Sequence, residues 1–144
     1  MSDDAATSNC TDASNYNHAE SSEGDVYEAG LAIRRSVLGD EYVDTALARL
    51  DDIGEPMNRL VTEWCWGTVW TRPGLDRSQR SLLNLGMLAA LGRGQELRIH
   101  LAGALRNGMS GDELIEVGLQ VAVYCGVPAA LDYNRILRSV LDDE

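Results

Sequence analysis

The fold is decided by residues 95–128, QELRIHLAGALRNGMSGDELIEVGLQVAVYCGVP. Apolar residues recur in this stretch at spacings of three and four, which is typical of helices with one apolar face. Gly108 interrupts the pattern, and Ser110 with Glu113 three residues later has the form of a capping box. A Gly-Val-Pro sequence then stops the helical pattern. The stretch therefore predicts two consecutive helices, over about residues 95–106 and 111–124.

The same helical pattern continues on both sides of this stretch, and no segment reads as a strand. Gly39, Gly54 and the pair Gly92 and Gly94 separate the helical segments, as glycines at helix ends commonly do. The further predicted helices span about residues 25–38, 40–53, 55–66, 76–91 and 128–141. The sequence thus predicts an all-α domain, a compact bundle of about seven helices.

Three segments carry expectations about burial. The segment Trp66–Leu75 contains a Pro-Gly pair and is expected to be a loop. The helix after Asp76, with Gln79 as its capping partner, is so rich in leucine that we expect it to be largely buried. The helix 111–124 is apolar nearly all round, which places it in the centre of the domain or in a subunit interface.

Composition and charge exclude several classes of protein. The chain has 144 residues, enough for one domain with its own core. Its net charge is −11 and it has no Lys, which disfavours nucleic acid and anionic membranes as partners. It has neither an apolar run of membrane-spanning length nor the start of a secretion signal. We expect a cytoplasmic protein with a disordered acidic tail over residues 1–24 and a single domain over 25–144.

The cysteines predict neither a disulfide framework nor a metal site. Cys10, Cys65 and Cys125 are widely spaced and form no CxxC pair, which favours reduced thiols. Together with the two histidines they lack the spacing of zinc ligands. No Gly-rich phosphate loop, GxSxG or HExxH pattern occurs. If the chain is an enzyme, acid–base chemistry without a metal or cofactor is the option that remains.

The residue that best fits acid–base chemistry is His100, the only histidine after the first 24 residues. Glu96 lies four residues earlier, so both side chains leave the same face of the predicted helix. A carboxylate beside an imidazole can fix its tautomer and raise its basicity, and such a pair can transfer protons near neutral pH. The alternative is an ordinary Glu–His pair on a solvated helix face.

Three further candidates lie in or directly after the helix 111–124. Glu116 is a carboxylate in an apolar helix, expected either near His100 or at the rim, where it faces solvent or pairs with an Arg of a neighbouring helix. Tyr124 could donate a hydrogen bond to a developing oxyanion at the helix end. Cys125 is either a participant in the chemistry or a small apolar side chain.

Candidates for substrate binding surround the Pro-Gly turn. Arg72 and Arg80 could hold a carboxylate in bidentate fashion, or they are ordinary surface cations. Trp66 and Trp70 are candidates for the wall of a binding site, or they are core aromatics.

Several motifs, in their order and spacing, resemble the carboxymuconolactone decarboxylase family. They are Arg34–Asp40 (RRSVLGD), Trp66–Leu75 (WGTVWTRPGL), Arg80–Leu82 (RSL), Glu96–His100 (ELRIH), Ala104–Gly108 (ALRNG) and Tyr124–Ala130 (YCGVPAA). The resemblance covers about residues 26–142. It implies an all-α fold, no metal or organic cofactor, and a ring-shaped homo-oligomer, either a trimer or a hexamer.

The resemblance also implies an activity, the decarboxylation of 4-carboxymuconolactone to 3-oxoadipate enol-lactone in protocatechuate catabolism (the β-ketoadipate pathway). The partner is then a small anionic lactone, whose carboxylate Arg72 or Arg80 would hold. Tyr124 would stabilise negative charge on the lactone oxygen. His100, oriented by Glu96, would deliver a proton to carbon.

One segment departs from the family pattern. After the proline the family usually carries Asn and then His or an aromatic residue, whereas this chain reads LDYNR over Leu131–Arg135. A paralogue that acts on another lactone or β-keto acid is therefore an alternative. Two further alternatives are a thiol-dependent protein of the peroxidase cycle, for which the chain keeps only Cys125 of a CxxC pair, and a non-catalytic helical oligomer.

Overall fold

A computed structural model describes residues 23–143, and every regular element in this range is a helix. The elements are α1 (Glu23–Leu38), α2 (Asp40–Ala48), α3 (Gly54–Leu60), the π-helix η1 (Val61–Trp70), α4 (Arg77–Ala90), α5 (Gly94–Arg106), α6 (Gly111–Cys125) and α7 (Val127–Leu141). The predicted all-α fold is confirmed. The predicted tail lies outside the described residues, except that Glu23 and Gly24 already belong to α1.

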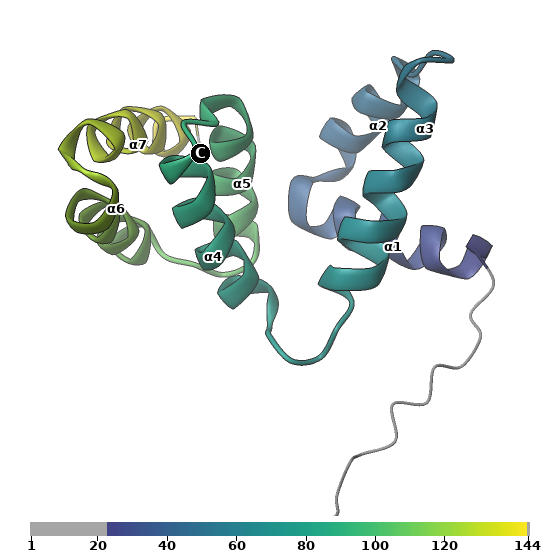
Figure 1. The fold of residues 1–144 in the computed structure, drawn as a ribbon, viewed down its shortest axis with the longest axis horizontal. Coiled ribbons are helices and arrows are strands. Elements are labelled where there is room, and N and C mark those ends of the chain that lie inside the picture. Colours follow the sequence, from purple (N-terminus) through teal and green to yellow (C-terminus); the bar gives the residue numbers. More distant parts are fainter. Residues whose placement is uncertain (1–22, 144) are drawn as a thin grey trace, which may run out of the picture.

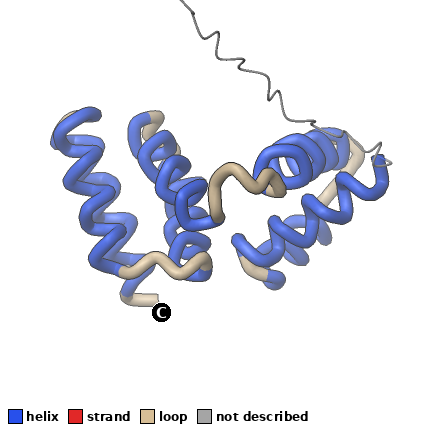
Figure 2. Tube along the Cα trace, turned by 90° about the horizontal axis from the view of Figure 1, so that it is seen from below, coloured by secondary structure: helices blue, strands red, loops and turns tan. Residues whose placement is uncertain are grey.

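The helices form two groups that lie side by side (Figure 1; Figure 2). The first group contains α1, α2, α3 and η1, and the second contains α4 to α7. Each group has its own cluster of buried apolar side chains. Between the groups α1 packs on α5, where a Cβ added to Gly103 would lie 3.0 Å from the carbonyl oxygen of Val37.

Within the first group, α1 rests directly on η1 through two glycines. A Cβ on Gly30 would lie 2.2 Å from the carbonyl oxygen of Thr62, and one on Gly67 would lie 2.4 Å from that of Val26. Real side chains do not approach backbone atoms so closely, so only glycine permits this spacing of the two helices. The contact fixes the position of η1, and with it that of Trp66 and Trp70.

The π-helix corrects one expectation from the sequence. A loop was expected over Trp66–Leu75, but the helical turns continue through Trp70. Thr62, Trp66 and Trp70 are spaced by four and are all buried, so the burial of two indoles outweighs the weak helical signal of this segment. The Pro-Gly turn follows only after Thr71. Wide i→i+5 turns of this kind are frequent at functional sites.

Helices α4 and α6 are more exposed than expected. The expectation that the long helix after Asp76 is largely buried was wrong, because Leu83 and Met87 on α4 are each 53% exposed. On α6, Leu119 is 56% exposed, so this helix is not in the centre of the domain. Of the two positions expected for it, the subunit interface remains. Both predicted capping boxes, Asp76 with Gln79 and Ser110 with Glu113, are present. None of the described helices is both long and apolar enough to span a membrane.

Candidate active site

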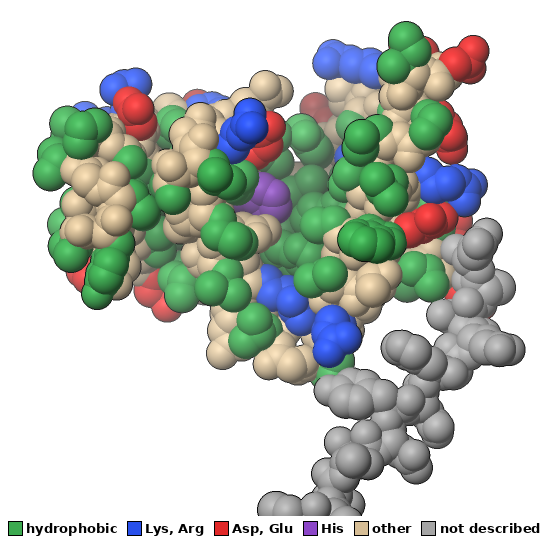
Figure 3. Space-filling model, viewed as in Figure 1, with side chains coloured by type: hydrophobic (Ala, Val, Ile, Leu, Met, Phe, Trp, Pro, Cys, Tyr) green, Lys and Arg blue, Asp and Glu red, His purple; other side chains and the backbone are tan. Residues whose placement is uncertain are grey.

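The predicted acid–base residue, His100 on α5, lies where the two groups of helices meet. Its ring stacks on Trp66, with centroids 6.2 Å apart and planes inclined by 9°, and on Trp70 at 6.4 Å and 27°. The two indoles lie 4.8 Å apart. Figure 3 shows the histidine in the hollow between the two groups. One predicted catalytic residue and two predicted wall residues therefore come together.

The imidazole of His100 is poised as a neutral base. Its Nδ1 atom is buried and makes no hydrogen bond within the described part of the chain. Burial of the ring lowers the pKa of His100, and the charge of Glu96 raises it by less. Glu96 is exposed, and no hydrogen bond joins the two side chains among the described residues. Glu96 thus acts on His100 through its charge, and the expected orientation by a hydrogen bond is not present.

We predict that His100 titrates below its ordinary value of 6.5 and that Glu96→Gln lowers its pKa further. Both values are measurable by NMR of the two imidazoles, with His100→Gln identifying the resonance. The pKa of His100 is lower in the folded state than in the unfolded state, so the unfolded state binds the proton more readily. The free energy of unfolding therefore decreases as the pH falls from 6.5 towards the folded pKa. A pKa above 6.5, or one that Glu96→Gln leaves unchanged, would contradict this prediction.

Of the two predicted carboxylate-binding arginines, Arg80 is the one whose side chain is held against the end of η1. Its Nη2 donates to the carbonyl oxygen of Arg72 at 3.0 Å, directly after the end of η1. Its Nε is buried and has no hydrogen-bond partner among residues 23–143. The side chain of Arg72 is exposed. Arg80 is therefore the better placed of the two to meet an anion beside Trp70.

Sequence reasoning missed a second arginine, Arg34 on α1, as a candidate for the site. Its Nη1 donates to Asn58 Oδ1 at 2.7 Å and to Thr62 Oγ1 at 3.2 Å. Burial raises the pKa of the Cys65 thiol, against the lowering effects of the Arg34 charge and of a hydrogen bond from Trp70. Arg34 thus lies close to η1. The available signal was its spacing of four from Gly30, which puts both on the face of α1 that contacts η1.

The other predicted catalytic residues lie elsewhere. Glu116, Tyr124 and Cys125 line a groove of about 690 Å³ between α4 and α6, together with Met87 and other apolar side chains. His100 is not among the residues that line this groove. Glu116 is exposed, which is the solvent-facing position that was the alternative to a place near His100. The three residues share a face of α6 but do not complete the His100 site within one protomer.

Comparison with known proteins decides the family. Residues 55–139 match the model of the carboxymuconolactone decarboxylase family. The chain belongs to this family. It is 42% identical over 118 residues to nitrosuccinic acid decarboxylase npaB of Metarhizium robertsii, which covers 82% of each chain. It is also 42% identical over 117 residues to 4-carboxymuconolactone decarboxylase of Acinetobacter baylyi, covering 81% of this chain and 87% of that protein.

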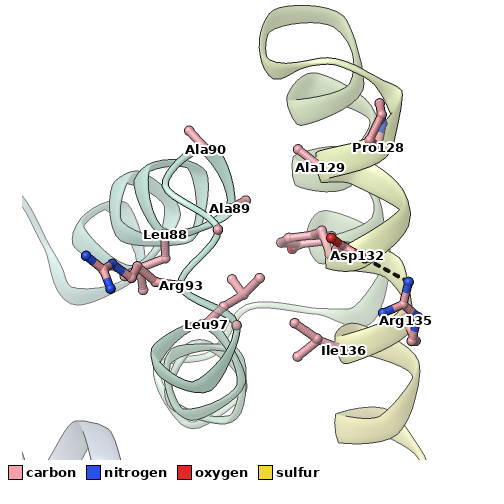
Figure 4. A pocket seen from close by; sticks show the side chains of 13 residues that line it. Leu88, Ala89, Ala90, Arg93, Leu97, Pro128, Ala129, Asp132, Arg135 and Ile136 are labelled. Carbon is pink, nitrogen blue, oxygen red and sulfur yellow. Dashed lines mark hydrogen bonds and ion pairs between the residues drawn. The ribbon is translucent and has the colours of Figure 1, made fainter.

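The segment that departs from the pattern expected of the carboxymuconolactone decarboxylase family lies away from His100. Tyr133 is fully buried, and its hydroxyl donates to the carbonyl oxygen of Leu114 at 2.9 Å. Asp132 and Arg135 pair at 2.7 Å beside a pocket of about 390 Å³ between α7 and the turn that joins α4 to α5 (Figure 4). The departure therefore alters the core and this second pocket rather than the surroundings of His100.

Within residues 23–143, no three His, Cys, Asp or Glu side chains lie close enough together to hold an ion. The described residues instead bring together an imidazole and two indoles, and they hold the guanidinium groups of Arg34 and Arg80 against the two ends of η1. This set can bind an anion, stack on a planar group and transfer a proton.

Proposed function

We propose that this chain is a decarboxylase whose reaction takes place at His100, between Trp66, Trp70 and Arg80. The observation that carries the proposal is the stacking of a half-buried imidazole, with an unpaired Nδ1, on two indoles. Its relatives named as decarboxylases support the reaction class. No cofactor is needed when the substrate itself accepts the electron pair.

For 4-carboxymuconolactone the reaction can be written with these groups. The bond between the ring carbon and its carboxylate breaks, carbon dioxide leaves, and the electron pair moves into the unsaturated lactone as a dienolate. His100 then delivers a proton to carbon, and the product is an enol-lactone. The negative charge of the bound substrate raises the pKa of the imidazole, which loads it with the proton that it transfers.

A second candidate substrate is nitrosuccinic acid, because the fungal relative at equal identity is named for its decarboxylation. Here a nitro group would accept the electron pair in place of the lactone. Both substrates leave a carbanion-like intermediate beside His100, so the site chemistry does not distinguish them.

The deciding experiment incubates the purified full chain with each acid in EDTA and measures released carbon dioxide. Turnover of 4-carboxymuconolactone without added metal or thiol supports the first assignment, and turnover of nitrosuccinate alone supports the second. Peroxide reduction that Cys125→Ser abolishes would instead support a thiol-dependent protein. If neither acid is consumed, the proposed substrates are wrong.

We further propose that the chain forms a homo-oligomer through the exposed apolar face of α4 and α6. Leu83, Met87 and Tyr124 line the groove between these helices and are each more than half exposed, and exposed apolar patches mark interfaces. The proposed assembly is the ring of three or six copies expected from the sequence. An interface here would cover the groove that contains Tyr124 and Cys125.

This proposal predicts that Met87→Glu lowers the mass of the assembly, because a carboxylate would be buried at the interface without a partner. Size-exclusion chromatography with light scattering measures the mass directly. Ala48→Glu, at an exposed position on α2, serves as the control and should leave the mass unchanged. A monomeric wild-type chain would rule out the assembly.

A further inference from the structure

We propose that Arg34 is a substrate-binding residue, and that the site holds a dicarboxylate with one carboxylate on Arg34 and the other on Arg80. The proposal rests on the assignment of the active site to His100. It adds a residue that was not among the candidates named from the sequence, and it assigns the two carboxylates that both proposed substrates carry to two particular arginines.

The packing of α1 on α5 and on η1 places Arg34 close to the element that carries both stacked indoles. The C-terminal end of α1 lies against α5, where a Cβ on Gly103 would lie 3.0 Å from the carbonyl oxygen of Val37. Arg34 lies one helical turn before Val37. Its side chain contacts Thr62 in η1, one turn before Trp66.

The hydrogen bonds of Arg34 leave one edge of its guanidinium free. Nη1 bonds to Asn58 and to the fully buried Thr62, which hold the group in place. Nε is buried and has no hydrogen-bond partner within residues 23–143, and both hydrogen bonds of the guanidinium come from Nη1 and not from Nη2. The Nε–Nη2 edge is one of those that bind a carboxylate in bidentate fashion. A half-buried donor edge that is fixed but unused is costly unless a ligand completes it.

The charge of Arg34 is also uncompensated. Four other arginines, including its neighbour Arg35, form ion pairs with carboxylates. Arg34 has no carboxylate within 4.0 Å in the part of the chain that the structure describes. A chain with a net charge of −11 has many carboxylates that could neutralise it. Seven further arginines also form no ion pair within the described residues, so what sets Arg34 apart, together with Arg80, is its buried Nε atom without a partner.

Arg80 provides the second charge at the other end of η1. Arg34 contacts Thr62 in the first turn of η1, and Arg80 contacts the backbone just after its last residue. Trp66 and Trp70, with His100 stacked on them, lie between these two points along the helix. An anion with two separated carboxylates matches this arrangement, and one with a single carboxylate leaves one arginine unpaired.

The test measures binding of succinate and of butyrate, a dicarboxylate and a monocarboxylate of equal length, to the full chain by calorimetry. Wild type should bind succinate at least about 10-fold more tightly than butyrate, because a charge-assisted hydrogen bond is worth about 10- to 100-fold in affinity. Arg34→Gln should remove this preference. Arg35→Gln, which removes the same charge one residue away, should retain it.

The variants are compared only where circular dichroism and thermal unfolding match wild type, and Arg34→Lys supplies a second variant. Lys keeps the charge but not the planar edge, so its preference for succinate should fall between those of wild type and Arg34→Gln. An unchanged preference in Arg34→Gln, equal losses in Arg34→Gln and Arg35→Gln, or no preference in wild type would each overturn the proposal. Binding is measured without turnover, so this outcome is separate from the question of which acid is decarboxylated.

Discussion

Replacement of His100 by Gln is expected to lower kcat for decarboxylation by about 10²–10⁴-fold, the usual loss when a general acid or base is removed. Gln is close to the size of the imidazole and can still pack on Trp66, but it cannot transfer a proton. Substrate binding through the arginines should remain, so KM should change much less than kcat. Release of carbon dioxide and formation of the product under saturating substrate give both constants.

The matched control for this variant is Glu96→Gln. Glu96 is exposed and raises the pKa of His100 only through its charge, so its removal should cost less than 10-fold, an amount about equal to one surface interaction. A folded His100→Gln variant with full turnover would show that another group protonates the substrate. If instead Glu96→Gln loses as much as His100→Gln, the carboxylate itself takes part in the reaction.

The second large effect is expected from Gly30→Ala, which should lower the free energy of unfolding by about 3 kcal/mol, at the upper end of the cost of overpacking. The added Cβ would lie 2.2 Å from the carbonyl oxygen of Thr62 and 2.7 Å from the nitrogen of Gly67. Both are backbone atoms, so no side chain can rotate to relieve the contact. Urea unfolding followed by circular dichroism measures the loss.

Gly111→Ala is the control for Gly30→Ala, since its added Cβ would only reach ordinary contact with Leu141 at 3.9 Å. It should change stability by no more than about 1 kcal/mol, in either direction. The Gly30 variant should also lose activity. Because α1 can no longer pack directly on η1, the two indoles of η1 should shift relative to His100. Stability close to that of wild type for Gly30→Ala would contradict the packing of α1 on η1.

The order of the helices could be predicted from the sequence because helix boundaries depend on local signals. The capping boxes at Asp76 and Ser110 and the glycines between the helices are such signals, and the structure confirms them. The extension of η1 to Trp70 could not be predicted, because it depends on burial of two indoles against helices that are distant in the sequence. The intrinsic helix propensities of these residues do not include the free energy of that burial.

The candidate site could be predicted only in part for the same reason. His100, Trp66 and Trp70 belong to recognisable motifs, and the structure brings their rings to one place. Glu116, Tyr124 and Cys125 share a helix face, but the direction of that face depends on how α6 packs. Arg34 was missed because its spacing from Gly30 indicates a binding position only once the packing of α1 on η1 is known, and an arginine in an amphipathic helix is otherwise read as solvated.

The two separate core clusters have a consequence for how the molecule opens. The first group of helices buries five apolar side chains in its cluster and the second buries thirteen in the described residues. Units with fewer buried contacts open with lower free energy, so amide hydrogens of α1 and η1 should exchange with solvent before those of α5 to α7. His100 would then lose both indoles while its own helix stays folded. The site therefore depends on the less protected half of the domain, and its loss on heating should precede global unfolding.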